Sequence, residues 1–122
     1  MNIVILIPAY NEENTIGSLI QKIPYTCAEK VQVLVLDDGS IDKTAELARK
    51  TGADRIVSHA ANLGLGTTFK DGLNEALAMG ADIIVNIDAD GQFDPQDIPR
   101  LIEPIIKGKA DMVTCSRFKD PR

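Results

Sequence analysis

Two aspartates one residue apart, Asp88 and Asp90, carry the clearest chemical signal in this sequence. They follow the apolar run 83–87, so we predict that they stand where a buried strand opens into a loop. Residues i and i+2 of an extended segment point to the same side, and two carboxylates held so close repel each other unless a proton or a cation lies between them. Mg²⁺ commonly binds through one or two carboxylates together with the phosphates of a substrate. The pair therefore predicts a site for a divalent metal and a diphosphate.

The elements that would position these aspartates alternate regularly along the chain. Short apolar runs without polar alternation predict strands, and stretches with helical spacing lie between them. One such stretch, 67–79, predicts a helix whose inward face holds Phe69, Leu73, Ala76 and Leu77. This alternation predicts an α/β fold, a Rossmann-like, mostly parallel sheet flanked by helices on both faces. The predicted strands are 3–7, 31–36, 55–58, 83–87 and 112–114.

Polar segments follow every predicted strand. Ligands of open α/β sheets bind outside the carboxyl ends of the strands, so these segments are expected to form one rim. Acidic residues dominate it, and Arg117 is almost their only counter-charge, which again favours a bound cation. The acidic residues of the rim are Glu12, Glu13, Asp37, Asp38, Asp88 and Asp90.

Each segment also has a simpler interpretation when taken alone. Residues 37–40 suit a turn followed by a helix cap, and residues 8–13 suit a loop with a capping acid. The glycines of 62–66 suit ordinary turns and lack the Gly-Lys-Ser/Thr ending of a Walker loop. His59 stands alone near a strand end, which favours a structural histidine over a catalytic one.

Bulk properties narrow the function classes. A length of 122 residues suits one domain, and a net charge of −5 without a basic block argues against nucleic acid as a partner. The longest unbroken apolar run, 3–7, is far too short to span a membrane, and no basic segment of a signal peptide precedes it. Cys27 and Cys115 match no metal-ligand spacing, which favours free thiols in a reducing, cytoplasmic compartment.

In their order along the chain, the strand-end segments resemble the motifs of family 2 glycosyltransferases, which have the GT-A fold, and especially the dolichyl-phosphate mannosyltransferase-like branch. The resemblance covers essentially the whole chain. It implies transfer of a sugar, with inversion, from a nucleoside-diphosphate sugar of the GDP-mannose or UDP-glucose type. The implied acceptor is a polyprenyl or dolichyl phosphate, which would place the whole protein at the cytoplasmic face of a membrane. The matching segments are 8–13, 37–40, 62–66, 88–92 and 116–118.

The resemblance also implies roles for single residues around the nucleoside. Tyr10 offers a flat apolar face to a base, and Asp38 offers an acceptor for a base N–H or a ribose hydroxyl. The whole set implied to line the base and the ribose is Pro8, Tyr10, Glu12, Leu36, Asp37 and Asp38.

A second implied set surrounds the diphosphate and its metal. Asp88 and Ala89 would lie along the ribose and the diphosphate, and Asp90 with Gln92 would hold Mg²⁺ or Mn²⁺. Arg117 would contact the phosphates, so that Asp88, Asp90 and Arg117 form the implied catalytic group. Because two side chains cannot fill an octahedral shell, the diphosphate and water must supply the remaining ligands.

Residues 1–122 are interpreted as a single GT-A domain that lacks its acceptor half, because such enzymes continue beyond this point. Two alternatives stay open. The chain could be a nucleotide-sugar-binding fragment without activity, or a phosphatase of the haloacid-dehalogenase type, although such phosphatases carry their acid pair after the first strand. A sheet edge left exposed by truncation could also pair with a second copy of the chain.

Overall fold

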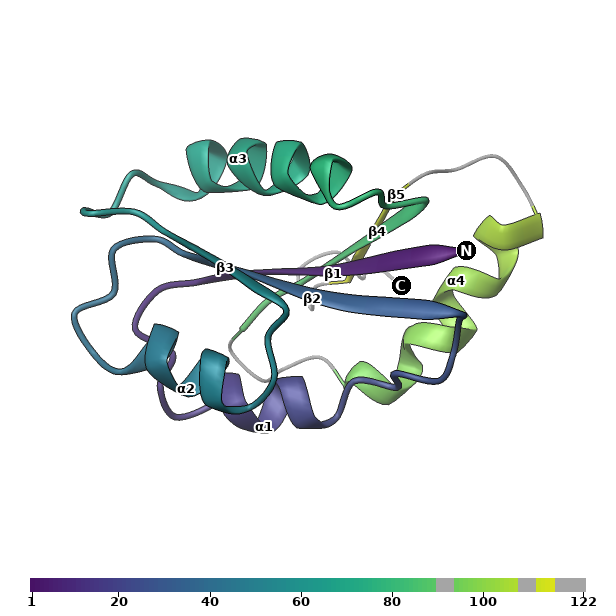
Figure 1. The fold of residues 1–122 in the computed structure, drawn as a ribbon, viewed down its shortest axis with the longest axis horizontal. Coiled ribbons are helices and arrows are strands. Elements are labelled where there is room, and N and C mark those ends of the chain that lie inside the picture. The colour runs from purple at the N-terminus through teal and green to yellow at the C-terminus, as the bar shows by residue number, and fades with distance from the viewer. Residues whose placement is uncertain (90–93, 108–111, 116–122) are drawn as a thin grey trace, which may run out of the picture.

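The structure is built around one five-stranded sheet, and the computed structural model describes residues 1–89, 94–107 and 112–115. Every pair of neighbouring strands is parallel, so the predicted α/β class is confirmed (Figure 1). In these ranges, no helix has both the length and the apolar character needed to cross a membrane. The elements are β1 (Asn2–Ala9), α1 (Ile16–Gln21), β2 (Lys30–Asp37), α2 (Thr44–Lys50), β3 (Arg55–Ser58), α3 (Leu65–Ala78), β4 (Ile83–Ile87), the 3₁₀ turn η1 (Pro95–Asp97), α4 (Ile98–Lys107) and β5 (Met112–Cys115).

The strand order β3-β2-β1-β4-β5 places β1 at the centre of the sheet. Its apolar side chains from Ile3 to Ile7 are fully buried, as expected for a parallel strand that is covered on both faces. From β1 the chain runs outward to β2 and β3, and it then returns to add β4 on the other side of β1. The strand order therefore reverses between β1 and β4, which is where ligands of such sheets bind.

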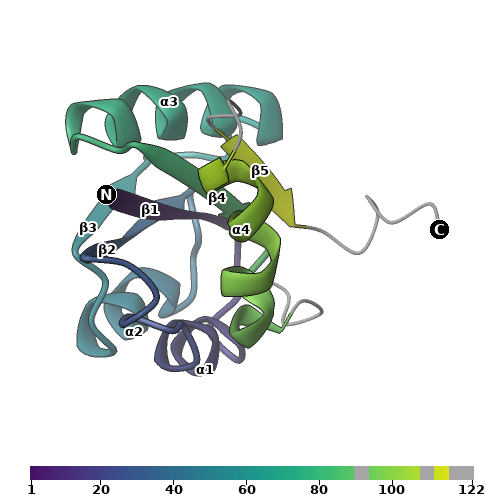
Figure 2. The same cartoon turned by 90° about the vertical axis from the view of Figure 1, so that its right-hand side faces the viewer.

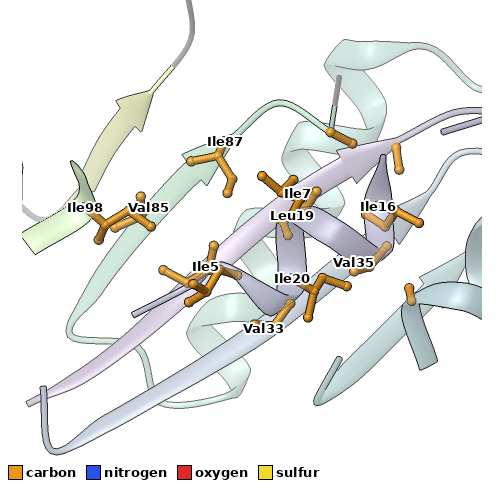
Figure 3. Close-up of a cluster of buried hydrophobic side chains, with 14 of the residues drawn as sticks. Ile5, Ile7, Ile16, Leu19, Ile20, Val33, Val35, Val85, Ile87 and Ile98 are labelled. Carbon is orange, nitrogen blue, oxygen red and sulfur yellow. The ribbon is translucent and has the colours of Figure 1, made fainter. Parts of the chain in front are cut away.

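Helices cover the two faces of the sheet with separate apolar clusters. The larger cluster joins side chains of α1, α2 and α4 to the side chains of β1, β2 and β4 that point to the same face, and Figure 3 shows its centre. The smaller cluster packs α3 against the opposite face (Figure 2). Alternate residues of β1 divide between them, because Ile5 and Ile7 point into the larger cluster and Val4 and Leu6 into the smaller.

Helix α3 differs in one respect from its predicted inward face. Phe69, Leu73 and Ala76 pack in the smaller cluster as predicted, but Leu77 is 62% exposed, so its predicted burial is wrong. Gly72 faces the sheet at close range, since a Cβ built there would lie 2.6 Å from Cδ1 of Leu6. The helix therefore approaches the sheet along the row of Phe69, Gly72 and Ala76, and Leu77 lies outside that row.

Candidate functional site

The loops that follow β1 and β2 lie side by side at the carboxyl edge of the sheet. The parallel register pairs Pro8 with Leu36 and Ala9 with Asp37. Beyond the last pair, the amide of Asp38 donates to the carbonyl oxygen of Ala9 at 2.9 Å. The residues predicted to line a nucleoside are thus brought together by the register of two central strands.

These residues differ in what they can offer a ligand. Tyr10 is 45% exposed, so its ring is available at the rim, and Pro8 and Glu12 are half-buried. The side chain of Leu36 is fully buried in the cluster beneath α3. A ligand could therefore reach Leu36 only through its backbone, whereas Tyr10 presents a side-chain surface.

Asp38 is a buried acceptor that organises the loop after β3. Its Oδ1 accepts the amide of Leu63 at 2.9 Å, and its Oδ2 accepts the amide of Gly64 at 3.0 Å. Burial alone would raise the pKa of Asp38, but hydrogen bonds from His59 and from these two amides outweigh burial and hold the pKa below its usual range. A nucleoside that binds to Asp38 would therefore contact a carboxylate that already accepts hydrogen bonds from this loop.

Residues 37–40 form the tight turn that was one interpretation of their sequence. The amide of Ser40 donates to Oδ1 of Asp37 at 3.0 Å, and Gly39 has a φ of +80°, which L side chains rarely adopt. A Cβ at Gly39 would lie 2.4 Å from the carbonyl carbon of Ala61. The turn thus packs against the loop that Asp38 holds.

A reciprocal set of hydrogen bonds joins the loop after β1 to the segment before α2. The amide of Asn11 donates to Oγ of Ser40 at 2.8 Å, while the amide of Ile41 donates to Oδ1 of Asn11 at 3.0 Å. The amide of Glu12 donates to Oγ1 of Thr44 at 2.8 Å. Side chains of each segment thus accept hydrogen bonds from backbone amides of the other, which fixes the two segments relative to each other.

Asp42 completes this set and should make it sensitive to acid. Its carboxylate accepts the amides of Thr44 at 3.0 Å and of Glu13 at 3.2 Å. Burial would raise the pKa of Asp42, but these bonds and the Thr44 hydroxyl outweigh burial and lower the pKa. A lowered pKa means that the stabilisation is complete above about pH 4, the usual value for aspartate, and is lost as the pH falls through the folded-state value.

We therefore expect Asp42→Asn to lower the free energy of unfolding at pH 7 by about 1–2 kcal/mol, because charge-assisted bonds to two amides become weaker neutral ones. The difference from the parent should shrink as the pH falls below 4, where the parent carboxylate takes up its proton. Urea unfolding between pH 3 and 7 measures this, with Asp97→Asn, at a half-exposed position, as the control. A difference that stays constant with pH would contradict the role of Asp42.

The end of β4 brings the acidic motif to the same edge. Asp88 is half-buried and Ala89 is 2% exposed. The hydroxyl of Thr15 donates to the carbonyl oxygen of Ala89, so the approach to α1 is tied to the motif. The predicted metal ligands Asp90 and Gln92, and also Arg117, lie outside the described residues.

In the described ranges, no three His, Cys, Asp or Glu side chains come close enough together to hold a metal ion. The structure thus describes the residues predicted to line a nucleoside and the strand end that leads into the predicted metal motif. The positions of the metal ligands themselves stay a prediction.

Several contacts that build the site are long-range and carry no local sequence signal. Thr15, Asp42 and Thr44 act through partners tens of residues away along the chain. His59 lies between Asp38 and Asp71, which agrees with its predicted structural role but adds two partners that were not predicted. Such long-range pairs become visible only when the loops are placed in space.

Comparisons with known proteins identify the same group that the motifs suggest. The family model Glycosyl transferase family 2 matches residues 4–122. UDP-N-acetylglucosamine–dolichyl-phosphate N-acetylglucosaminyltransferase of Methanococcus voltae is 32% identical over 98% of this chain and 53% of its own length. Polyprenol monophosphomannose synthase of Mycolicibacterium smegmatis is 33% identical over 94% of this chain and 44% of its own. The chain therefore spans about half the length of the curated relatives it matches.

Solved structures show the same similarity. Glucosyl-3-phosphoglycerate synthase from Mycobacterium tuberculosis, crystallised with Mn²⁺, UDP and phosphoglyceric acid, aligns with a TM-score of 0.71 and 34% identity. The alignment covers 88% of this chain and 40% of that one. The same enzyme has also been crystallised with Mg²⁺ and UDP, and that structure aligns with a TM-score of 0.69.

Proposed function

Because the chain belongs to glycosyl transferase family 2 and has the GT-A fold, we propose that it forms the donor-binding part of a glycosyltransferase. The whole protein would transfer a sugar, with inversion, from a nucleoside diphosphate to an acceptor. One observation carries this proposal. The strand order reverses between β1 and β4. The carboxyl ends of β1, β2 and β4 meet at that edge, and they carry Tyr10, Asp37, Asp38 and Asp88.

The nucleoside is proposed to lie against the loops after β1 and β2. The exposed ring of Tyr10 would stack on the base, with Pro8 and Glu12 beside it. Asp37 and Asp38 supply acceptors beneath it, and the buried Leu36 contributes its backbone. UDP in the related mycobacterial structures supports a uridine nucleotide, whereas the mannosyl relative keeps GDP-mannose as a second donor candidate.

A divalent ion, Mg²⁺ or Mn²⁺, fits the donor set of the acidic motif. Asp90 would hold it with Gln92, since carboxylate and amide oxygens are the ligands that such hard cations prefer. When bound, the ion offsets the negative charge that develops on the leaving diphosphate. Asp88 and Ala89 are proposed to line the ribose and diphosphate, and Arg117 would add a charge-assisted contact to the phosphates.

The acceptor is proposed to be a polyprenyl or dolichyl phosphate at the cytoplasmic face of a membrane. The names of the relatives from Methanococcus voltae and Mycolicibacterium smegmatis support this class. A phosphate oxygen is already ionised at neutral pH, so this acceptor needs no catalytic base. The phosphatase hypothesis has no support, because the acid pair follows β4 and the family model is that of a glycosyltransferase.

Calorimetric titration of the 122-residue chain with GDP and with UDP tests the proposal. We expect one of the two nucleotides to bind, and to bind at least tenfold more tightly with Mn²⁺ than with a chelator, because the diphosphate supplies ligands to the ion. Conversely, Mn²⁺ alone should bind weakly. If neither nucleotide shows metal-dependent binding, the proposal is overturned. If Mn²⁺ binds equally well with and without nucleotide, the diphosphate does not supply ligands to the ion.

A further inference from the structure

A histidine outside the proposed contact residues lies between two carboxylates. Nδ1 of His59 is 2.8 Å from Oδ1 of Asp38, and Nε2 is 2.9 Å from Oδ2 of Asp71. The side chains of His59 and Asp38 are only 11% and 9% exposed, whereas that of Asp71 is 43% exposed. The imidazole therefore bridges the end of β2 and helix α3 across the base of the loop 59–64.

This geometry suits only one protonation state of the ring. An ionised carboxylate accepts hydrogen bonds and donates none, and a neutral imidazole has a single N–H. With both ring nitrogens at hydrogen-bond distance from carboxylate oxygens, a neutral ring would turn a lone pair toward one of them. Doubly protonated His59 instead donates to Asp38 and to Asp71, the two charged groups that act on it in the described structure.

The bridge contacts Asp38, which is a residue of the proposed donor site. Oδ1 of Asp38 accepts from both His59 and the amide of Leu63, and Oδ2 accepts from the amide of Gly64. Movement of the ring would thus release a carboxylate that holds the loop. We propose that His59, in its imidazolium form, is a positioning residue that fixes Asp38 and the loop 62–64 for donor binding. The role in donor binding rests on the proposed function.

The histidine should make the loop sensitive to a rise in pH. The hydrogen bond to Asp38 raises the pKa of His59, Asp71 adds to this, and burial opposes both. For a raised pKa, the stabilisation is complete below about pH 6.5, the usual value for histidine, and is lost as the pH rises through the folded-state value. Loss of the proton leaves the ring with one N–H for two carboxylates. Because Asp38 also accepts the amides of Leu63 and Gly64, we expect the remaining N–H to stay on Nε2 toward Asp71, so that the bond to Asp38 is the one that breaks.

His59 is the only histidine of the chain, so its ring gives unique nuclear magnetic resonance signals. Below its titration both ring nitrogens should be protonated, and its midpoint should lie above 6.5. The protection factors of the Leu63 and Gly64 amides against hydrogen exchange, corrected for intrinsic rates, should fall about tenfold or more as the ring loses its proton, since a hydrogen bond to a charged group is broken. A midpoint at or below 6.5, or protection unchanged across the titration, would overturn the proposal.

Asp71→Asn provides a matched variant, because residue 71 is partly exposed and the exchange is nearly isosteric. The asparagine amide can donate to Nε2 of a neutral ring, whose Nδ1–H then still donates to Asp38. The variant should therefore lower the midpoint of His59 and keep the loop protected above it, unlike the parent. Lys70→Gln, an exposed neighbour on α3, should behave as the parent does. The same alkaline loss of protection in Asp71→Asn would count against the bridge.

Nucleotide titration across the same pH range separates this proposal from the proposed function. In the parent, the affinity for UDP or GDP with Mn²⁺ should fall about tenfold in parallel with the titration of His59, and in Asp71→Asn it should not. A constant affinity in the parent would overturn the positioning role. If neither nucleotide binds at any pH, the proposed function fails with the donor-binding half of the proposal, and the protection factors still decide whether His59 holds the loop.

Discussion

Asp90→Asn is expected to weaken the metal-dependent binding of UDP or GDP by roughly 100-fold, because loss of a partner that only orients a ligand already costs about 10–100-fold in metal affinity. Asparagine keeps the size of the side chain and one oxygen but removes the charge that a divalent ion requires. Calorimetric titration of each nucleotide with Mn²⁺ and with a chelator measures the effect. The affinity in chelator should not change, since that binding depends on the base and the ribose.

Asp97→Asn is the matched control for this prediction. Asp97 undergoes the same chemical change and is a half-exposed residue of η1 whose carboxylate pairs with Arg100 three residues later. We expect its metal-dependent binding to equal that of the parent, because exposed pairs of this kind contribute little. If Asp90→Asn also binds like the parent, then Asp90 is not the metal ligand, and the assignment of the acidic motif fails.

The second large effect is expected from Gly39→Ala, which should lower the free energy of unfolding by about 3 kcal/mol. The residue has a φ of +80°, where an L side chain costs about 1–2 kcal/mol. Its Cβ would also lie 2.4 Å from the carbonyl carbon of Ala61 and 2.5 Å from the amide of Asn62, and overpacking of this kind costs about 1–3 kcal/mol. Both neighbours are backbone atoms, so the loop itself must move.

Gly52→Ala separates the two causes. Gly52 has a φ of +111° just beyond α2, and a Cβ there would meet nothing within 4 Å. Urea unfolding should show a loss of only about 1 kcal/mol for this variant, which carries the backbone strain without the clash. Gly39→Ala should in addition weaken nucleotide binding, because the loop 62–64 is displaced from Asp38. Equal losses of stability in the two variants would contradict close packing at Gly39.

The structure changes how the acidic rim should be understood. The sequence suggests carboxylates that repel one another and require a cation. In the described residues, Asp37, Asp38 and Asp42 instead accept backbone amides, and Asp38 also contacts His59. Much of the negative charge thus orders loops before any ligand arrives. The predicted cation is assigned to the motif after β4, where Asp88 and Asp90 stand one residue apart.

The sequence by itself determined the class of the fold and the edge of the sheet at which the site is proposed. All five strands were predicted within a few residues, because apolar runs of parallel strands need no tertiary partner to be recognised. The rule that ligands bind at strand carboxyl ends then selected one edge of the sheet for the proposed site. Leu77 was misplaced, because helical spacing alone does not say that the small Gly72 sets the direction in which α3 approaches the sheet.

Only the tertiary structure decided the strand order, and with it which loops meet. Local patterns cannot show that β4 returns beside β1, since strand pairing depends on contacts between residues far apart in the chain. The same holds for the side chains that hold the site together. Asp38, His59 and Asp71 come from the end of β2, the loop after β3 and helix α3. Their hydrogen bonds form because the fold brings these three segments together, and the spacing of the residues in the sequence does not show that they meet.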